Sequence, residues 1–267
     1  MATSPWTYVI GPFFGALLAF TLARMYDASR RFYEHVAAAN LALMTLKNQY
    51  NDFLLFRMGF AQDCVRLSLN GEEPVWSLLR PSHMRYGDYE FDLEKIAFLF
   101  ESGTRPPVFE AIELAQITHR DLLKLDGQRT DTARETQRQV ARELKGEKVG
   151  LDAAEKVLGK AYVAELEMLV EGLALRAYDG EQVYIKAFKG LRAALREHIM
   201  QTWHYRFGYL WRMRHDDTVE KMLVQMKDRL SPGFNADELP ALPEKLQARV
   251  NQVLAARKAF QAGAEKG

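Results

Sequence analysis

The sequence predicts an all-α protein, in which an N-terminal transmembrane helix continues into a long stalk helix and a helical-bundle cytoplasmic domain. No charged side chain precedes Arg24, and an apolar heptad pattern follows directly. The rest of the 267 residues repeats apolar positions at helical spacing, without strand-like alternation or internal repeats. We divide the chain into an anchor with its juxtamembrane segment (1–27), a stalk helix (28–69), a helical bundle (70–230), and a linker with a C-terminal helix (231–267).

The predicted anchor is the segment 6–23, WTYVIGPFFGALLAFTLA. At 1.5 Å per residue it spans about 27 Å, close to a hydrocarbon core of ~30 Å. A cleaved signal peptide would carry a basic segment before the apolar run, and a buried core helix would have a polar face. Arg24, Arg30 and Arg31 follow the span, so the positive-inside rule places the N-terminus outside the inner (plasma) membrane and the other domains in the cytoplasm.

Small residues recur every four positions within this segment, at Gly11, Gly15, Ala19 and Ala23. They share one helix face, where small side chains allow two backbones to approach closely. This predicts a homodimer through the transmembrane helix. The alternative is that glycine and alanine are simply common in membrane helices, and the sequence leaves both interpretations open.

The stalk helix is predicted by apolar side chains at alternating steps of three and four residues, interrupted only by Arg57. The pattern broadens at residues 53–56, so we expect the far end to pack into the chain's own bundle, and Gly71 and Pro74 to end the helix. The single cysteine, Cys64, lies on this stripe and is interpreted as a buried structural thiol. The stripe consists of Phe32, Val36, Ala39, Leu43, Leu46, Tyr50, Phe53, Phe60, Cys64 and Leu67.

The bundle begins with an irregular connection over 70–91, whose apolar side chains at 75–79 are expected to pack beneath it. Asp92 can cap a short helix, and Pro106 and Pro107 start the next one. Residues 128–148 are almost entirely polar, which predicts a solvated helix or a hairpin tip. Further helices are expected from 151 to about Asp179-Gly180, from 181 to about 214 or 230, and from 243 to about 261 after a proline-containing linker.

Several enzyme classes lack their motifs in this sequence. It contains no G-x-G, Walker A, G-x-S-x-G or HExxH pattern, and no glutamate three residues before a histidine. We therefore expect no cofactor, no metal and no catalytic residue, although scattered catalytic groups would escape such a search. His119 lies on an apolar helical face and is interpreted as a satisfied core histidine, while Glu167 and Glu171 are interpreted as solvated surface carboxylates.

The segment from Gln182 to Arg214 combines basic and aromatic side chains, although the net charge of the whole chain is only +1. Such a helix could bind anionic lipid headgroups, an acidic partner or nucleic acid. The alternative is an amphipathic bundle helix with its cations in water. The candidate polyanion- or partner-binding residues are Lys189, Arg192, Arg196, Trp203, Arg206, Trp211 and Arg212.

Four short stretches carry a resemblance to a known group of proteins: residues 40–43 (NLAL), 49–52 (QYND), 91–93 (FDL) and 97–99 (AFL). They resemble uncharacterised bacterial single-pass membrane proteins with an N-terminal anchor and a helical cytoplasmic domain. The resemblance implies this architecture and no activity. The function favoured by the sequence is a non-enzymatic scaffold or signal-relay subunit that binds another protein. The alternatives are a lipid- or nucleic-acid-sensing module, and an enzyme with a cryptic helical site.

Overall fold

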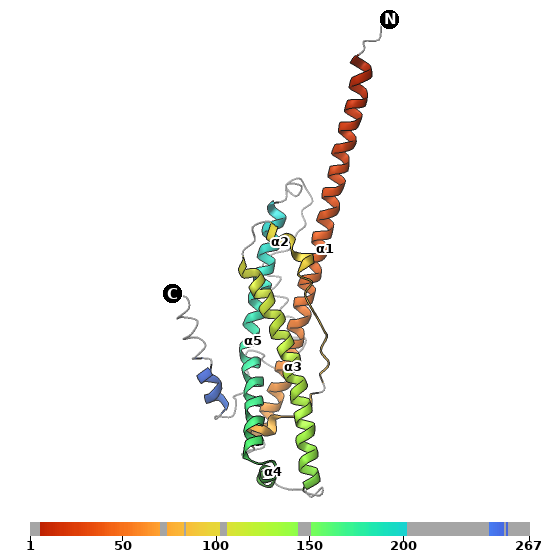
Figure 1. Ribbon diagram of the computed structural model, residues 1–267. Coiled ribbons are helices and arrows are strands. Elements are labelled where there is room, and N and C mark those ends of the chain that lie inside the picture. The colour runs from red at the N-terminus through yellow and green to blue at the C-terminus, as the bar shows by residue number, and fades with distance from the viewer. Residues whose placement is uncertain are drawn as a thin grey trace.

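In the computed structural model, the residues described are 6–69, 74–82, 84–101, 106–143, 151–201, 246–253 and 255, and none of them forms a strand. Three long helices form the bundle: α1 (Trp6–Leu69), α3 (Pro106–Glu143) and α5 (Lys160–Gln201). Helix α5 runs antiparallel to the other two (Figure 1). The short elements are η1 (Val75–Leu78), η2 (Glu94–Ile96), α2 (Phe98–Glu101) and α4 (Leu151–Leu158). The predicted all-α fold class is confirmed.

Helix α1 is one unbroken helix of 64 residues, with a length of about 96 Å at 1.5 Å per residue. Its N-terminal part extends well beyond the other helices (Figure 1). Contact with the bundle is established at His35, whose ring stacks on that of Phe98 with 4.1 Å between the centroids. The predicted continuation of the N-terminal segment into the stalk helix is therefore confirmed.

A search of the described residues for membrane-spanning helices found none that is both long enough and apolar enough to cross a bilayer. The predicted transmembrane anchor therefore remains a prediction.

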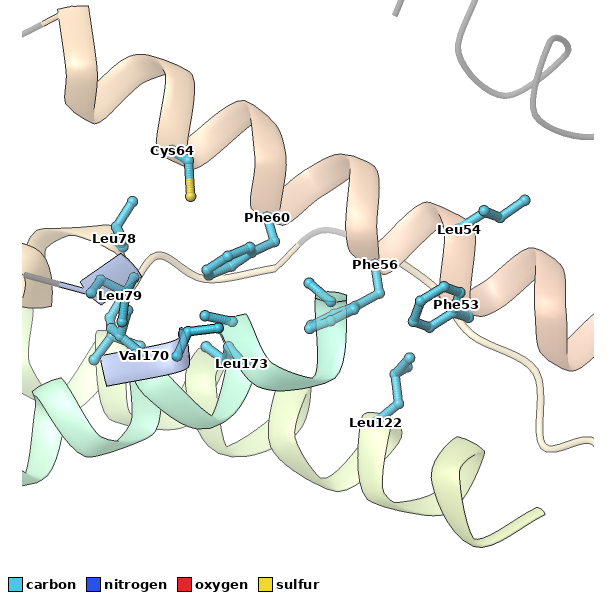
Figure 2. Close-up of a cluster of buried hydrophobic side chains, with 14 of the residues drawn as sticks. Phe53, Leu54, Phe56, Phe60, Cys64, Leu78, Leu79, Leu122, Val170 and Leu173 are labelled. Carbon is cyan, nitrogen blue, oxygen red and sulfur yellow. The ribbon is translucent and has the colours of Figure 1, made fainter. Parts of the chain in front are cut away.

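The heptad stripe of α1 packs into the core of the bundle. Figure 2 shows Phe56 and Phe60 directed from α1 toward the neighbouring helices, where Val170 and Leu173 of α5 lie. Burying a phenylalanine side chain contributes about 1.5–3 kcal/mol, so these rings are a main attachment of α1. The sequence-based expectation that this helix packs into its own chain is confirmed, and the buried stripe residues are Ala39, Leu46, Tyr50, Phe53, Phe60, Cys64 and Leu67.

After α1, the irregular connection follows the surface of α1 and α3. Its buried backbone groups have no helical partners, and polar side chains bind them instead. Gln49 donates a hydrogen bond to the Tyr89 carbonyl at 2.7 Å, and the Gly87 N–H donates to Asp52 at 3.0 Å. The Phe91 N–H donates to Gln116 of α3 at 3.1 Å. As expected, the apolar side chains at the start of this connection are buried, namely Trp76, Leu78 and Leu79.

The predicted helix end at Asp179-Gly180 is wrong, because α5 continues without a break from Lys160 to Gln201. Gly180 instead allows α5 to approach α1 closely. A Cβ atom at this position would lie 2.5 Å from Cε2 of Phe53 on α1, so a side chain here would collide with that ring. The break lies at Gly159, which has a φ of 79° and whose N–H donates to the Glu155 carbonyl at 3.0 Å. This left-handed geometry is a common end of a helix, here of α4.

Two further segments contribute side chains to the core. Helix α3 continues to Glu143, and its polar second half is not fully solvated, since Arg129, Ala133 and Thr136 are buried. Residues 246–253 are helical, within the predicted C-terminal helix, and their buried side chains Leu246 and Val250 join the main core. The predicted linker before them lies outside the described residues.

Candidate interaction surfaces

Exposed apolar side chains cover the projecting part of α1. We define this N-terminal apolar surface as Phe13, Phe14, Leu17, Leu18, Phe20 and Leu22, which are between 47% and 65% exposed. Adjacent helix positions point in different directions, so these side chains cover several sides of the helix rather than one stripe. Contiguous apolar surface of this kind marks a site of contact with a membrane or another protein.

The predicted dimerisation residues lie within this projecting part. Ala19 and Ala23 are exposed, and nothing outside the helix backbone lies within 4 Å of a Cβ atom built at Gly15. The surroundings of Gly11 lie outside the described residues. The small-residue face is therefore open to a partner, and the homodimer remains a prediction.

Where α1 leaves the bundle, three rings join three helices. The ring of His35 on α1 stacks on Phe98 of α2, and its Nδ1 lies 3.3 Å from Nε2 of His198 on α5. The rings of Phe98 and His198 are also in contact, with 4.8 Å between their centroids. This cluster fixes the base of the projecting helix, and the sequence analysis did not identify it because its members are more than sixty residues apart.

His119 of α3 is a buried core histidine, as predicted, with only 1% of its side chain exposed. Its Nε2 lies 3.1 Å from Oδ2 of Asp52 on α1, and the same carboxylate oxygen accepts a hydrogen bond from the Gly87 N–H. A general base must be within reach of its substrate. Asp52 and His119 are instead enclosed between helices, so their arrangement joins α1, α3 and the irregular connection.

Arg57, which interrupts the apolar stripe of α1, also has a structural partner. Its Nη1 lies 2.5 Å from Oε2 of Glu181 on α5, and the Tyr50 hydroxyl donates to Oε1 of the same carboxylate at 2.9 Å. A buried charge is tolerated when it is paired and hydrogen-bonded. The exception in the stripe was a signal of this ion pair, although the sequence could not identify its partner.

A second buried ionic group surrounds Arg129 of α3. Its guanidinium forms an ion pair with Asp63 of α1, lies 3.8 Å from Asp126, and donates to the Arg80 carbonyl at 2.9 Å. Burial raises the pKa of both carboxyls, and the charge of Arg129 opposes this shift. Burial also raises the pKa of the neighbouring Cys64 thiol to about 12, so the thiol stays protonated and is a poor nucleophile.

The predicted polyanion-binding residues are only partly described. On α5, Lys189 and Arg196 are exposed and Arg192 is half-buried. Phe188, Leu191 and Leu195 of the same helix are buried, as the bundle-helix alternative requires. The other candidates, Trp203, Arg206, Trp211 and Arg212, lie outside the described residues. Their combination with the cations of α5 therefore remains a prediction.

A surface depression of about 470 Å³ is lined by residues of α3 and α5, namely Asp131, Thr132, Arg134, Glu135, Arg138 and Tyr162. Its two carboxylates and two guanidiniums give this lining no net charge. Glu167 and Glu171 of α5 are less solvated than expected, since both face Arg249, at 3.3 and 4.0 Å.

Among the described residues, no three or more His, Cys, Asp or Glu side chains are placed to hold a metal ion.

Comparison with known proteins gave no match: no protein-family model, no curated protein and no solved structure is similar to this chain.

Proposed function

We propose that this protein is a membrane-tethered, non-enzymatic interaction protein, a scaffold or signal-relay subunit whose bundle lies at the cytoplasmic face. The observation that carries the proposal is the N-terminal apolar surface, which extends beyond the bundle on an unbroken helix. Leaving a leucine or phenylalanine side chain in water forgoes about 1.5–3 kcal/mol relative to burying it. Six such side chains give a strong driving force toward an apolar environment.

A lipid bilayer fits this surface better than a protein partner does. A protein would cover one side of the helix, whereas lipid covers all sides at once. The absence of charge before Arg24 supports the same conclusion. The proposal rests on the whole segment 6–23, and the side chains before Pro12 lie outside the described residues.

The charges that follow this segment support a cytoplasmic bundle. Arg24, Arg30 and Arg31 come after the apolar stretch, whereas residues 1–5 contain no Lys or Arg. Cytoplasmic flanks of membrane helices are enriched in these residues. The short N-terminus would then face outward, and α1 would carry the bundle away from the inner surface.

The buried polar side chains of the bundle support an interaction role rather than a catalytic one. Asp52 and Arg57 on α1, with their partners His119 and Glu181, are used to join helices. Side chains enclosed between packed helices are out of reach of a substrate. What the bundle offers to other molecules is its long helical surface, which suits a scaffold.

For the cations of α5 that the structure describes, the distance from the bilayer argues against binding to lipid headgroups. His198 of α5 lies beside His35, which is 11 residues beyond Arg24 and thus about 17 Å farther along an upright helix. Arg192 and Lys189 lie farther still along α5. The charges of headgroups are screened over about 8 Å at physiological ionic strength, so these cations would feel them weakly.

The tether can be tested by extracting membranes of cells that express the full chain. We expect the protein to resist alkaline carbonate and to require detergent. Replacing Phe14 and Leu17 by arginine should release it, because each arginine near the middle of a span costs about 2.5–3.5 kcal/mol. The matched control replaces Leu114 and Ile117 of α3 by arginine. These residues have the same spacing as Phe14 and Leu17 and similar exposure, and the control should leave the protein in the membrane.

The orientation can be tested in the same cells with a membrane-impermeant thiol reagent. A cysteine introduced at Ser4 should be labelled in intact cells, and one introduced at Gly263 only after permeabilisation. Carbonate-soluble parent protein would contradict the tether. Labelling at residue 263 in intact cells would contradict only the orientation.

A further inference from the structure

The side of α1 opposite the bundle has a continuous exposed face. The residues of this face lie within a sector of about 80° around the helix axis, because successive residues of an α-helix are turned by about 100°. The large members are well exposed, with Leu41 at 50% and Met44 at 61%. We define this outer face as Ala19, Ala23, Tyr26, Tyr33, Ala37, Leu41 and Met44, all of which are exposed.

The described part of the protein's own bundle does not cover this face. Ala39, Ala42 and Leu46 lie on the opposite side of the same turns and are buried against the bundle. Leu41 and Met44 therefore point away from every described helix that packs on α1 at this level. Two exposed apolar side chains one turn apart, on a helix already packed on its other side, form a typical site for a second helix.

Lipid cannot cover the lower part of this face either. Leu41 follows Arg24 by 17 residues, which corresponds to about 26 Å along the helix. The headgroup region on one side of a bilayer is about 5–8 Å thick, from the difference between the total and hydrocarbon thickness. A helix standing upright from the membrane therefore holds Leu41 and Met44 well clear of lipid.

We propose that a second copy of this chain covers the outer face, with two α1 helices packed in parallel. The inference rests on the proposed function, because a shared anchor gives both copies the same orientation. Gly15 falls in the same sector as the outer face, so helices that meet in the membrane stay in contact down to Met44. Arg30 also falls in this sector, and its own Glu34, 3.0 Å away on the same helix, offsets its charge.

Disulfide trapping in isolated membranes tests the pairing in the full chain. Met44→Cys should form a covalent dimer on mild oxidation, because equivalent residues face each other in a parallel pair. Met168→Cys on α5 is the matched control, since Met168 is 62% exposed and Met44 61%. The native Cys64 is buried, so the parent chain should give no dimer.

The expected result is dimer formation at least about tenfold faster for Met44→Cys than for Met168→Cys. Equal rates, with both variants in the membrane fraction, would overturn the pairing and leave the tether intact. If the chain is instead soluble, the tether fails, and the same comparison of rates still decides the pairing.

A second variant removes the apolar contact without adding a thiol. Leu41→Glu with Met44→Glu should weaken the dimer about tenfold or more, measured by amine crosslinking in membranes over a range of expression levels. Both positions are exposed, so the bundle should keep its helical content and its folding. Met168→Glu should leave the dimer unchanged. A full-strength dimer in the double variant would overturn the proposal.

Discussion

Arg57 of α1 and Glu181 of α5 form an ion pair inside the bundle, with 2.5 Å between Nη1 and Oε2. Only 9% of the arginine side chain and 13% of the glutamate side chain are exposed. The second carboxylate oxygen accepts the hydroxyl hydrogen of Tyr50. The pair therefore joins α1 and α5 inside the bundle.

Removing one partner should therefore be costly. We expect Arg57→Met to lower the free energy of unfolding by about 3–5 kcal/mol, because Glu181 loses its buried counter-charge. The measurement is denaturant unfolding of the full chain in mild detergent, followed by circular dichroism. The double variant Arg57→Met, Glu181→Gln should recover much of this loss, because the remaining amide is neutral and still accepts from Tyr50.

An exposed ion pair provides the control for this prediction. Arg120 and Glu90 lie 2.6 Å apart, with both side chains more than half exposed. Arg120→Met should cost less than about 1 kcal/mol, as for surface pairs in general. Similar losses for Arg57→Met and Arg120→Met would contradict the importance assigned to the buried pair.

A side chain at residue 180 should separate α1 from α5. Gly180→Ala places a methyl group 2.5 Å from the fully buried ring of Phe53, which must move. We expect a loss of about 1–3 kcal/mol, typical of overpacking, in the same unfolding experiment. Gly127→Ala on α3 is the control, since its Cβ would meet nothing within 4 Å. That variant should gain up to about 1 kcal/mol from helix propensity, and a gain in both variants would contradict the proposed contact.

The buried carboxyl of Asp126 should make stability depend on pH. Burial raises its pKa in the folded state, so the folded protein binds a proton more readily than the unfolded chain does. Stability from this group therefore increases as the pH falls through the folded pKa, down to the unfolded value of about 3.9. Asp126→Asn should be more stable than the parent at neutral pH, and the difference should shrink on acidification toward about pH 4.

Unfolding curves of the two proteins at several pH values measure this difference directly. Asp131→Asn, an exposed position on the same helix, should shift stability little at any pH. A difference between Asp126→Asn and the parent that stays constant or widens on acidification would contradict the prediction.

The helical pattern of the sequence was sufficient to predict the fold class and the buried face of α1. Phe53, Phe60 and Cys64 are buried as their spacing indicated. Apolar residues that recur every three to four positions lie on one face of a helix, and that face packs against the core. The position of the helix break in the second half was not predictable in this way. Gly180 and Gly159 are both glycines after a helical pattern, and only the neighbouring Phe53 and a positive φ distinguish their roles.

The sequence alone therefore determined local properties: helices, their apolar faces, the charge-free N-terminal segment and the missing catalytic motifs. Only the tertiary structure decided which polar residues are partners, because Asp52 and His119, or Arg57 and Glu181, are far apart along the chain. It also decided that Leu41 and Met44 remain exposed. A helix periodicity identifies a face, but whether another helix covers that face depends on contacts between distant segments, which no local pattern contains.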